Sequence, residues 1–310
     1  MRIISWNVNS VRLRVDNLAR LASEWQPDVV CIQEVKAEAK DFPFEALKAI
    51  GFEHIHLRGM KGYNGVAVLS RLPLQKPGGE NWCGKEDSRH AMVRLPGGIE
   101  LHNFYIPAGG DIPDPDANDK FAHKLGFLDE ATTWFAEGRR NGRKMILLGD
   151  LNIAPLETDV WSHKELLNVV SHTAIEVEKL KQLQASAKWV DAVRKIVPPA
   201  ERLYSWWSYR AADWSASDRG RRLDHVWVTP ALAGAVTGAR VLKEARGWKM
   251  PSDHAPVIVD FSCRPQPSRC PRTRRRQARP GSGSRPAGRR GGGPSGSSAG
   301  LFRANRPSRS

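Results

Sequence analysis

The sequence has no apolar run of the roughly 20 residues that a membrane-spanning helix needs. Its first residues, MRIISWNVNS, turn polar where a signal peptide would carry its apolar stretch. It has four cysteines and no C-x-x-C pair. This spacing excludes a zinc knuckle and a disulfide scaffold, and reduced thiols are typical of a cytosolic chain. These absences predict a cytoplasmic protein that does not bind a membrane.

Acidic residues are missing from residues 264–310, a segment with 13 Arg. The net charge of +15 therefore leaves only +2 for residues 1–263, so basic composition says little about the function of the body. The segment is rich in Arg, Pro, Gly and Ser and has no apolar periodicity, which predicts disorder. Two interpretations stay open: a tail that binds nucleic acid, or a frameshifted or read-through end of the gene. We expect one folded domain over residues 1–262 and a disordered basic tail over 263–310.

Short apolar segments alternate with amphipathic ones along the body. The apolar segments predict strands at residues 2–7, 28–33, 65–70, 99–106, 144–149, 222–228 and 256–261. Helices are predicted after a cap at Ser10 and within residues 116–140 and 173–195. This alternation is typical of an α/β domain with at least one large sheet.

Polar side chains recur where these strands end. Asn7 ends the first strand, Glu34 follows VVCIQ, and Asp150 and Asn152 follow MILLG. A lone acid at a strand end is most often a cap, but several such positions together are hard to explain by capping. Carboxylate and amide oxygens on separate strand ends are what Mg²⁺ prefers. The pattern therefore indicates a metal site at a sheet edge.

One histidine stands apart from the others because of its neighbours. His254 lies in the segment PSDHAPV, beside Asp253 and just before a strand, and Asp224 begins another buried strand. An Asp–His pair formed by Asp224 and His254 would fix the imidazole's tautomer and hold its charge near a phosphoryl oxygen. His225 should point to the opposite face of its strand, and we assign it no role.

Six motifs follow one another along the body. They are SWNVNSVR (5–12), PDVVCIQEVK (27–36), NFYIPAGG (103–110), LLGDLNIAP (147–155), RRLDHVWV (221–228) and PSDHAPV (251–257). Their order and spacing resemble the exonuclease III and abasic-endonuclease family of deoxyribonuclease I-like phosphodiesterases, most closely its bacterial exonuclease III branch. The resemblance implies a four-layer α/β sandwich, with two mixed β-sheets packed face to face and helices on the outer faces.

The resemblance also implies a role for each polar residue of the motifs. Glu34 would be the principal metal ligand for Mg²⁺, with Mn²⁺ able to substitute. Asp150 would prepare the attacking water, while Asn152 and Tyr105 contact the scissile phosphate. His254, supported by Asp224, would neutralise the phosphoryl oxygen. The candidate metal shell comprises Asn7, Glu34, Asp150, Asn152, Asp253 and His254. Whether Asp150 or the His254–Asp224 pair takes the proton stays open.

Other positions are expected to contact double-stranded DNA. They are Lys36, Trp207, Arg221, Leu223 and Trp248, of which the two tryptophans and the leucine would form an apolar pocket for a flipped-out sugar. Two departures from the family pattern stand out. Ala108 replaces an amide-bearing residue, and Asn9 replaces an aspartate that some relatives carry.

The expected function is therefore a monomeric DNA-repair hydrolase that needs no protein partner. It would combine 3′-to-5′ exodeoxyribonuclease and abasic-site endonuclease activities. One alternative is a relative that acts on an inositol phosphate, a sphingolipid or an RNA 3′ end. Another is a non-catalytic DNA-binding module, against which the intact Glu34, Asp150, Asn152 and His254 weigh.

Overall fold

Two six-stranded sheets build the fold, which the computed structural model describes for residues 1–138, 142–211 and 213–262. The first has, in spatial order, β13 (Val236–Val241), β14 (Val257–Phe261), β1 (Arg2–Asn7), β2 (Val29–Gln33), β4 (Val66–Ser70) and β3 (His54–Arg58). The second has β5 (Gln75–Gly78), β6 (His90–Leu95), β7 (Ile99–Tyr105), β8 (Met145–Asp150), β12 (Asp224–Val228) and β9 (Val190–Asp191). Near the centre of each sheet one pair is parallel, β1 with β2 and β7 with β8. A separate short ribbon joins β10 (Trp206–Trp207) to β11 (Gly220–Arg221).

The central strands are buried on both faces, as their continuous apolar runs predict. Alternate residues of β1 and β2, such as Ile3 and Val29, point into a core shared with Leu101 and Ile146 of the second sheet. Their neighbours in the sequence point the other way, into a second core that α1 helps to form. Because successive side chains of a strand point to opposite faces of the sheet, the apolar residues of one strand alternate between the two cores.

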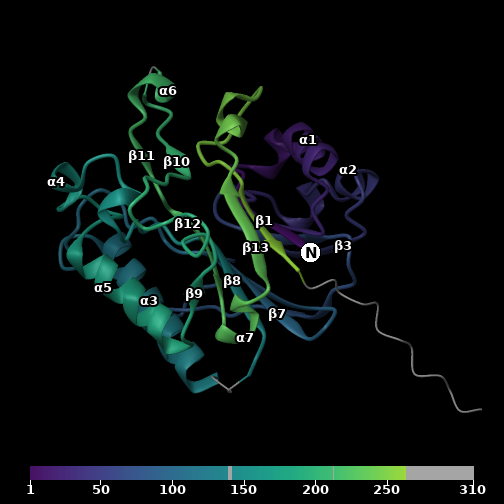
Figure 1. The fold of residues 1–310 in the computed structure, drawn as a ribbon, viewed down its shortest axis with the longest axis horizontal. Helices are drawn as coiled ribbons and strands as arrows, with labels where there is room; N and C mark the ends of the chain where they lie inside the picture. The colour runs from purple at the N-terminus through teal and green to yellow at the C-terminus, as the bar shows by residue number, and fades with distance from the viewer. Residues whose placement is uncertain (139–141, 212, 263–310) are drawn as a thin grey trace, which may run out of the picture. The chain divides into compact units, whose positions relative to one another are not determined.

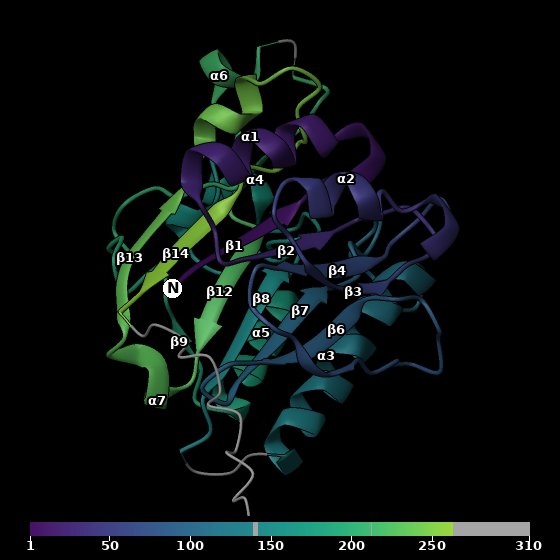
Figure 2. The ribbon, with the colours of Figure 1, turned by 90° about the vertical axis from the view of Figure 1, so that its right-hand side faces the viewer.

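Helices cover the two outer faces, so the fold has four layers (Figure 1, Figure 2). α1 (Val15–Trp25) and α2 (Phe44–Ala49) pack on the first sheet, and α3 (Asp119–Gly138) and α5 (Ala174–Ser186) pack on the second. The shorter helices are α4 (His163–Leu166), α6 (Trp214–Ser217), α7 (Pro230–Ala233) and the 3-10 turns η1 (Val11–Leu13), η2 (Ala39–Asp41), η3 (Glu157–Asp159) and η4 (Lys243–Gly247). The four-layer α/β sandwich is confirmed. No described helix is long and apolar enough to cross a membrane.

Two predicted helix boundaries were wrong. Ser10 makes no capping bond, because the backbone first forms η1 and α1 begins only at Val15. Thr173 does cap α5, but that helix ends at Ser186 and does not continue to residue 195. Lys188 adopts a left-handed conformation (φ 55°), and the chain then enters β9. The predicted tail, 263–310, lies outside the described residues, and the domain boundary at 262 stays a prediction.

His225, on β12, is fully buried, and only one of its two ring nitrogens has a hydrogen-bond partner among the described residues. Its Nε2 donates to the Ile153 carbonyl (2.8 Å), while Nδ1 has no hydrogen-bond partner among the described residues. Protonating Nδ1 would place a charged N–H where nothing accepts it. Burial accordingly lowers the pKa of His225 to about 4.

This lowered pKa predicts a loss of stability in mild acid. The unfolded chain binds a proton at His225 near pH 6.5 and the folded chain only near pH 4, so protonation favours unfolding as pH falls between these values. The His225→Gln variant keeps a donor for the Ile153 carbonyl. When the pH is lowered from 7 to 4.5, its free energy of unfolding should fall by about 2 kcal/mol less than that of wild type. Urea titrations of wild type, His225→Gln and the control His54→Gln measure this. Equal losses in all three proteins would show that His225 is not the responsible group.

Candidate active site

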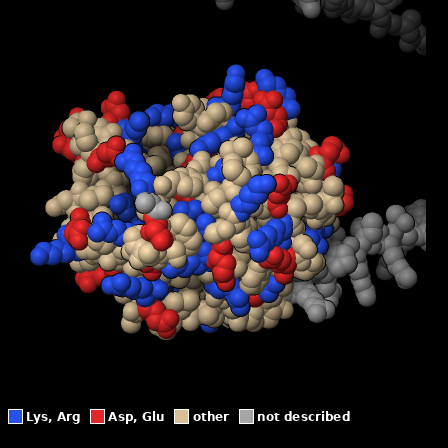
Figure 3. Space-filling model, turned by 90° about the horizontal axis from the view of Figure 1, so that it is seen from above, with Lys and Arg blue, Asp and Glu red and all other residues tan. Residues whose placement is uncertain are grey.

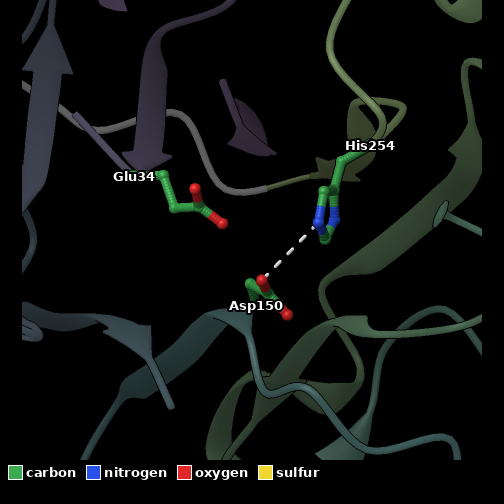
Figure 4. Close-up of side chains that lie close together, drawn as sticks. All are labelled: Glu34, Asp150 and His254. Atoms are coloured by element: carbon green, nitrogen blue, oxygen red, sulfur yellow. Dashed lines mark ion pairs between the residues drawn. The ribbon is translucent and has the colours of Figure 1, made fainter. Parts of the chain in front are cut away.

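The predicted polar residues meet where the ends of the two parallel strand pairs converge. Asn7 ends β1 and Glu34 follows β2, while Tyr105 ends β7 directly beside Asp150 at the end of β8. Asp224, the first residue of β12, pairs with Asp150 on its other side. The carboxyl ends of neighbouring parallel strands lie at one sheet edge, so each sheet delivers its polar residues to the same place. Figure 4 shows Glu34, Asp150 and His254 pointing toward one another from separate segments.

Unusual backbone conformations place these side chains. Gly149 has φ 136°, and a Cβ atom there would lie 2.0 Å from the Phe104 carbonyl oxygen, so only glycine lets β8 approach β7 this closely before Asp150. Glu34 (φ 50°) and Asn152 (φ 53°) both adopt the left-handed region, which is uncommon for residues other than glycine. Such strain clusters at functional sites, where the surrounding fold holds it in place.

Asn7 links the two carboxylates at the centre of the site. Its Nδ2 donates to Glu34 Oε1 (2.8 Å) and to Asp150 Oδ2 (2.9 Å). The Tyr105 hydroxyl donates to the same Glu34 oxygen (3.1 Å). Ligand atoms of Glu34, Asp150 and His254 lie within 4.8 Å of one another, a grouping that could hold a metal ion. The two carboxylates in this grouping offer the oxygen ligands that a hard divalent cation prefers.

His254 is held between two aspartates. Its Nδ1 is 2.8 Å from Asp224 Oδ2, and its Nε2 is 3.7 Å from Asp150 Oδ2. Ser205 Oγ donates to the same Asp224 oxygen (2.6 Å), which orients that carboxylate. The His254 carbonyl accepts a bond from Trp6 Nε1 (2.9 Å), tying this loop to β1. Asp224 and His254 therefore form the predicted pair. The pair is buried, and further hydrogen bonds from Ser205 and Trp6 hold its two members in place.

The two central groups have strongly shifted pKa values. Burial acts to lower the pKa of His254, but the charges of Asp224 and Asp150 outweigh it and raise the pKa to about 10. Burial raises the pKa of Asp150 to about 7, and the charge of His254 only partly opposes this. His254 is thus an imidazolium at neutral pH, while Asp150 titrates near neutrality. Both pKa values are raised, which makes His254 a cation that can bind an anion and Asp150 a candidate proton acceptor near neutral pH.

Asn9 joins the two remaining charged residues of the site. Its Nδ2 donates to Asp253 Oδ1 (3.0 Å), and its Oδ1 accepts from Lys36 Nζ (2.6 Å). Lys36 also pairs with Glu34 Oε2 (2.7 Å). An amide can donate and accept at once, which explains why asparagine suits this position where a carboxylate could not donate. The second oxygen of Asp253 accepts from Trp206 Nε1 (3.0 Å), and Asp253 lies outside the grouping of metal-ligating atoms.

A pocket of about 720 Å³ opens beside these residues. Arg221, Leu223 and Trp207 line it as expected, but Trp207 is only 2% exposed and its neighbour Trp206 is the more accessible of the two. Lys36 and Trp248 do not line it. Trp248 packs instead against Trp6 and under Arg20, so its predicted pocket role does not fit its position. Figure 3 looks down on the end of the molecule that carries α6 and shows Lys and Arg interspersed with acidic residues there.

Sequence reasoning missed part of the pocket wall. Trp161 lies under the Arg219 guanidinium (4.4 Å to the ring centroid), and Trp206 lies under that of Arg221 (5.5 Å). The adjacent tryptophans Trp206 and Trp207, in the segment SWWSYR (205–210), gave a signal for the second of these pairs. Trp161 and Arg219 lie in segments without a recognisable motif, so nothing in the sequence pointed to them.

Paired carboxylates beside a buried imidazolium, at the strand ends of a four-layer α/β sandwich, define a hydrolase acting on phosphate esters. The Endonuclease/Exonuclease/phosphatase family matches residues 4–254, and the chain belongs to this family. It is 28% identical over 276 residues to exodeoxyribonuclease III of Haemophilus influenzae, covering 84% of this chain and 100% of that protein.

Several solved structures share the fold. An AP endonuclease from Archaeoglobus fulgidus superposes with a TM-score of 0.79 at 30% identity, covering 85% of this chain and 100% of that one. A 3′ phosphatase from Neisseria, bound to a product DNA hairpin, gives 0.77 at 31% identity over 85% and 100% of the two chains. These similarities assign the chain to the exonuclease III and abasic-endonuclease branch, and it is a hydrolytic nuclease.

Proposed function

We propose that this nuclease is a DNA-repair enzyme that degrades double-stranded DNA from 3′ ends and incises it at abasic sites. The observation that carries the proposal is the convergence of Glu34, Asp150 and His254 beside a large pocket. The similarity to an exodeoxyribonuclease III and to an AP endonuclease supports both activities.

The metal in this proposal is Mg²⁺, for which Mn²⁺ can substitute, held by Glu34 with Asn7 and Asp150 beside it. When bound, such an ion supplies positive charge to the phosphoryl oxygens. Asn7 holds the two carboxylates next to each other by donating to both of them. We assign His254 to phosphate and not to metal, because a protonated imidazole has no lone pair for a ligand bond. Asp253 is assigned to holding Asn9 and Trp206 in place.

Asp150 is the proposed proton acceptor. Its pKa of about 7 matches the pH at which a general base works best, whereas His254 already carries a proton. In this proposal the Asp150 carboxylate orients the attacking water and takes its proton. Asn152 donates its backbone N–H to Asp150 Oδ1 (3.0 Å) and one side-chain N–H to the Ile106 carbonyl (2.9 Å), and in this proposal its second side-chain N–H donates to the scissile phosphate.

His254 and Tyr105 act on the phosphate itself. The imidazolium, kept charged by Asp224, lies where negative charge develops on the phosphoryl oxygens, and it is already in place before the reaction begins. The Tyr105 pKa is raised well above its usual range by burial and by Glu34 and Asp150, so its hydroxyl keeps its proton and can donate it. We propose that it donates to a phosphate oxygen or to the departing one.

The pocket is proposed to hold the nucleotide next to the scissile bond. Leu223 and Trp206 offer apolar surface to an extruded sugar, and Arg221 offers positive charge to the strand. A single chain supplies every residue of this site, so we propose a monomer that needs no protein partner.

Replacing Glu34 by Gln tests the metal assignment. The change removes a charge and keeps the shape, so the metal should bind more weakly. Activity should fall about tenfold at low Mg²⁺ and recover as Mg²⁺ or Mn²⁺ rises. Cleavage of an abasic duplex is measured against metal concentration for wild type, Glu34→Gln and Asp150→Asn. The assignment is wrong if Glu34→Gln needs no more metal than wild type.

A further inference from the structure

A buried ion pair lies directly behind the candidate active site. Lys124 of α3 and Glu176 of α5 have fully buried side chains, and their Nζ and Oε1 atoms are 2.5 Å apart. Removing two charges from water is costly, and a pair of apolar side chains would fill such a space at least as well. Helix packing alone therefore does not account for a lysine and a glutamate at these positions.

The Lys124 ammonium uses each of its three protons. One goes to Glu176, the second to the Asn152 carbonyl (2.8 Å) and the third to the Ala108 carbonyl (3.2 Å). Ala108 follows β7 and lines the pocket, while Asn152 follows β8. Lys124 thus joins the two loops that leave the catalytic ends of the parallel pair.

Lys124 is one of three hydrogen-bond partners that hold Asn152 in place. The backbone N–H of Asn152 is held by Asp150, its side-chain Nδ2 donates to the Ile106 carbonyl (2.9 Å), and its carbonyl is held by Lys124. The residue keeps a left-handed φ of 53°, a conformation that needs support from its surroundings. Without Lys124 its carbonyl would be buried with one bond fewer.

Glu176 connects Lys124 to the pocket wall through further hydrogen bonds. It accepts from the Ser171 N–H (2.9 Å) and from the Thr173 hydroxyl (2.7 Å), and Ser171 Oγ in turn accepts from Arg221 (2.8 Å). These bonds do not involve the ammonium. A glutamine at position 176 keeps one acceptor oxygen for the Ser171 N–H and the Thr173 hydroxyl, and its amide nitrogen replaces the oxygen that faces Lys124.

We propose that Lys124 is a positioning residue for catalysis. It fixes the backbone of Asn152 relative to Ala108 and so sets where the Asn152 amide meets the scissile phosphate. This inference rests on the proposed role of Asn152. Displacing a positioned group by about 1 Å can cost on the order of 10²-fold in rate, even when the altered residue does not touch substrate.

The test separates positioning from stability. Lys124→Met alone leaves a buried, unpaired carboxylate and should lower the melting temperature. Lys124→Met/Glu176→Gln removes both charges, so its melting temperature should exceed those of Lys124→Met and Glu176→Gln, each of which leaves one buried charge unpaired. Its kcat on an abasic duplex should stay about 10²-fold below that of Glu176→Gln, with KM within about threefold. The variant Lys124→Gln/Glu176→Gln, which regains a donor for one carbonyl, should recover part of that kcat.

A matched control lies on the same two helices. Asp129 and Lys179 form a pair (2.6 Å) between α3 and α5 on the exposed side. Asp129→Asn/Lys179→Met should leave kcat unchanged. If this control and wild type fail to cleave the abasic duplex, the proposed function is wrong.

Two results would overturn the inference about Lys124. One is equal kcat for Glu176→Gln and Lys124→Met/Glu176→Gln. The other, which applies even if the methionine variant does not fold, is equal kcat for Glu176→Gln and Lys124→Gln/Glu176→Gln, since glutamine cannot reach both carbonyls as lysine does.

Discussion

An Asp150→Asn protein should bind abasic duplex DNA as tightly as wild type and cleave it about 10³-fold more slowly. Asparagine keeps the size of the side chain and an acceptor for the Asn152 N–H, so the fold should persist. It loses the negative charge that orients the water and accepts its proton. General-base catalysis contributes typically about 10²- to 10⁴-fold to a rate, and no other described group at the site combines this position with a pKa near 7.

Single-turnover cleavage and equilibrium binding together measure this effect. Binding is followed by fluorescence anisotropy of a labelled duplex, with Asp129→Asn, an exposed carboxylate on α3, as the control. Raising Mg²⁺ or Mn²⁺ should not restore Asp150→Asn, in contrast to Glu34→Gln. Turnover above roughly a tenth of wild type would mean that Asp150 does not prepare the water.

Replacing Asp224 by Asn should lower kcat by about 10²-fold at pH 9 and by much less at pH 6. The charges of Asp224 and Asp150 hold the pKa of His254 at about 10, so wild type keeps the imidazolium throughout this range. Without the Asp224 charge, burial acts against the protonated form and the His254 pKa falls. The variant should therefore lose activity as pH rises through its new, lower pKa, because electrostatic stabilisation of the phosphoryl charge is lost with the proton.

The pH profile of kcat from 6 to 10 tests this directly. Ser205→Ala is the control, because it removes the hydroxyl that donates to Asp224 and accepts from the Leu223 and Asp224 N–H groups but leaves the Asp224 charge; it should shift the alkaline limb in the opposite direction or not at all. A profile for Asp224→Asn that is parallel to that of wild type would show that the Asp224 charge is not what keeps His254 protonated.

The sequence predicted the central strands and their polar ends because both follow from local patterns. β1, β2 and β8 are short apolar runs with a polar residue at the end, and parallel neighbours bring such ends together. The family, the four-layer fold and the hydrolytic activity were likewise confirmed. The edge strands β3, β5, β9 and β13 were missed, and so was β6 beside β5. The four edge strands are partly exposed, and none of the five has the continuous apolar run by which the central strands were predicted.

The finer parts of the site depend on contacts between distant segments. Ser205 reaches Asp224 and Asn9 reaches Asp253 across 19 and 244 positions of the chain, and no local pattern encodes such meetings. Trp248 was expected to line the pocket because it resembles a pocket-forming position of the family. The side chain packs instead on Trp6. Lys124 lies in no motif that the sequence analysis identified, and the packing of α3 against α5 buries it.

One measurement tests the central claim most directly: cleavage of a duplex with a single abasic site, labelled at the 5′ end, by the purified protein with Mg²⁺ or with a chelator. We expect a single cut at the abasic site with Mg²⁺, followed by shortening from the new 3′ end, and no cut with the chelator. The same preparation should release no phosphate from an inositol polyphosphate. An intact abasic duplex in Mg²⁺, or equal cleavage in the presence of chelator, would contradict a metal-dependent DNA-repair nuclease built on Glu34, Asp150 and His254.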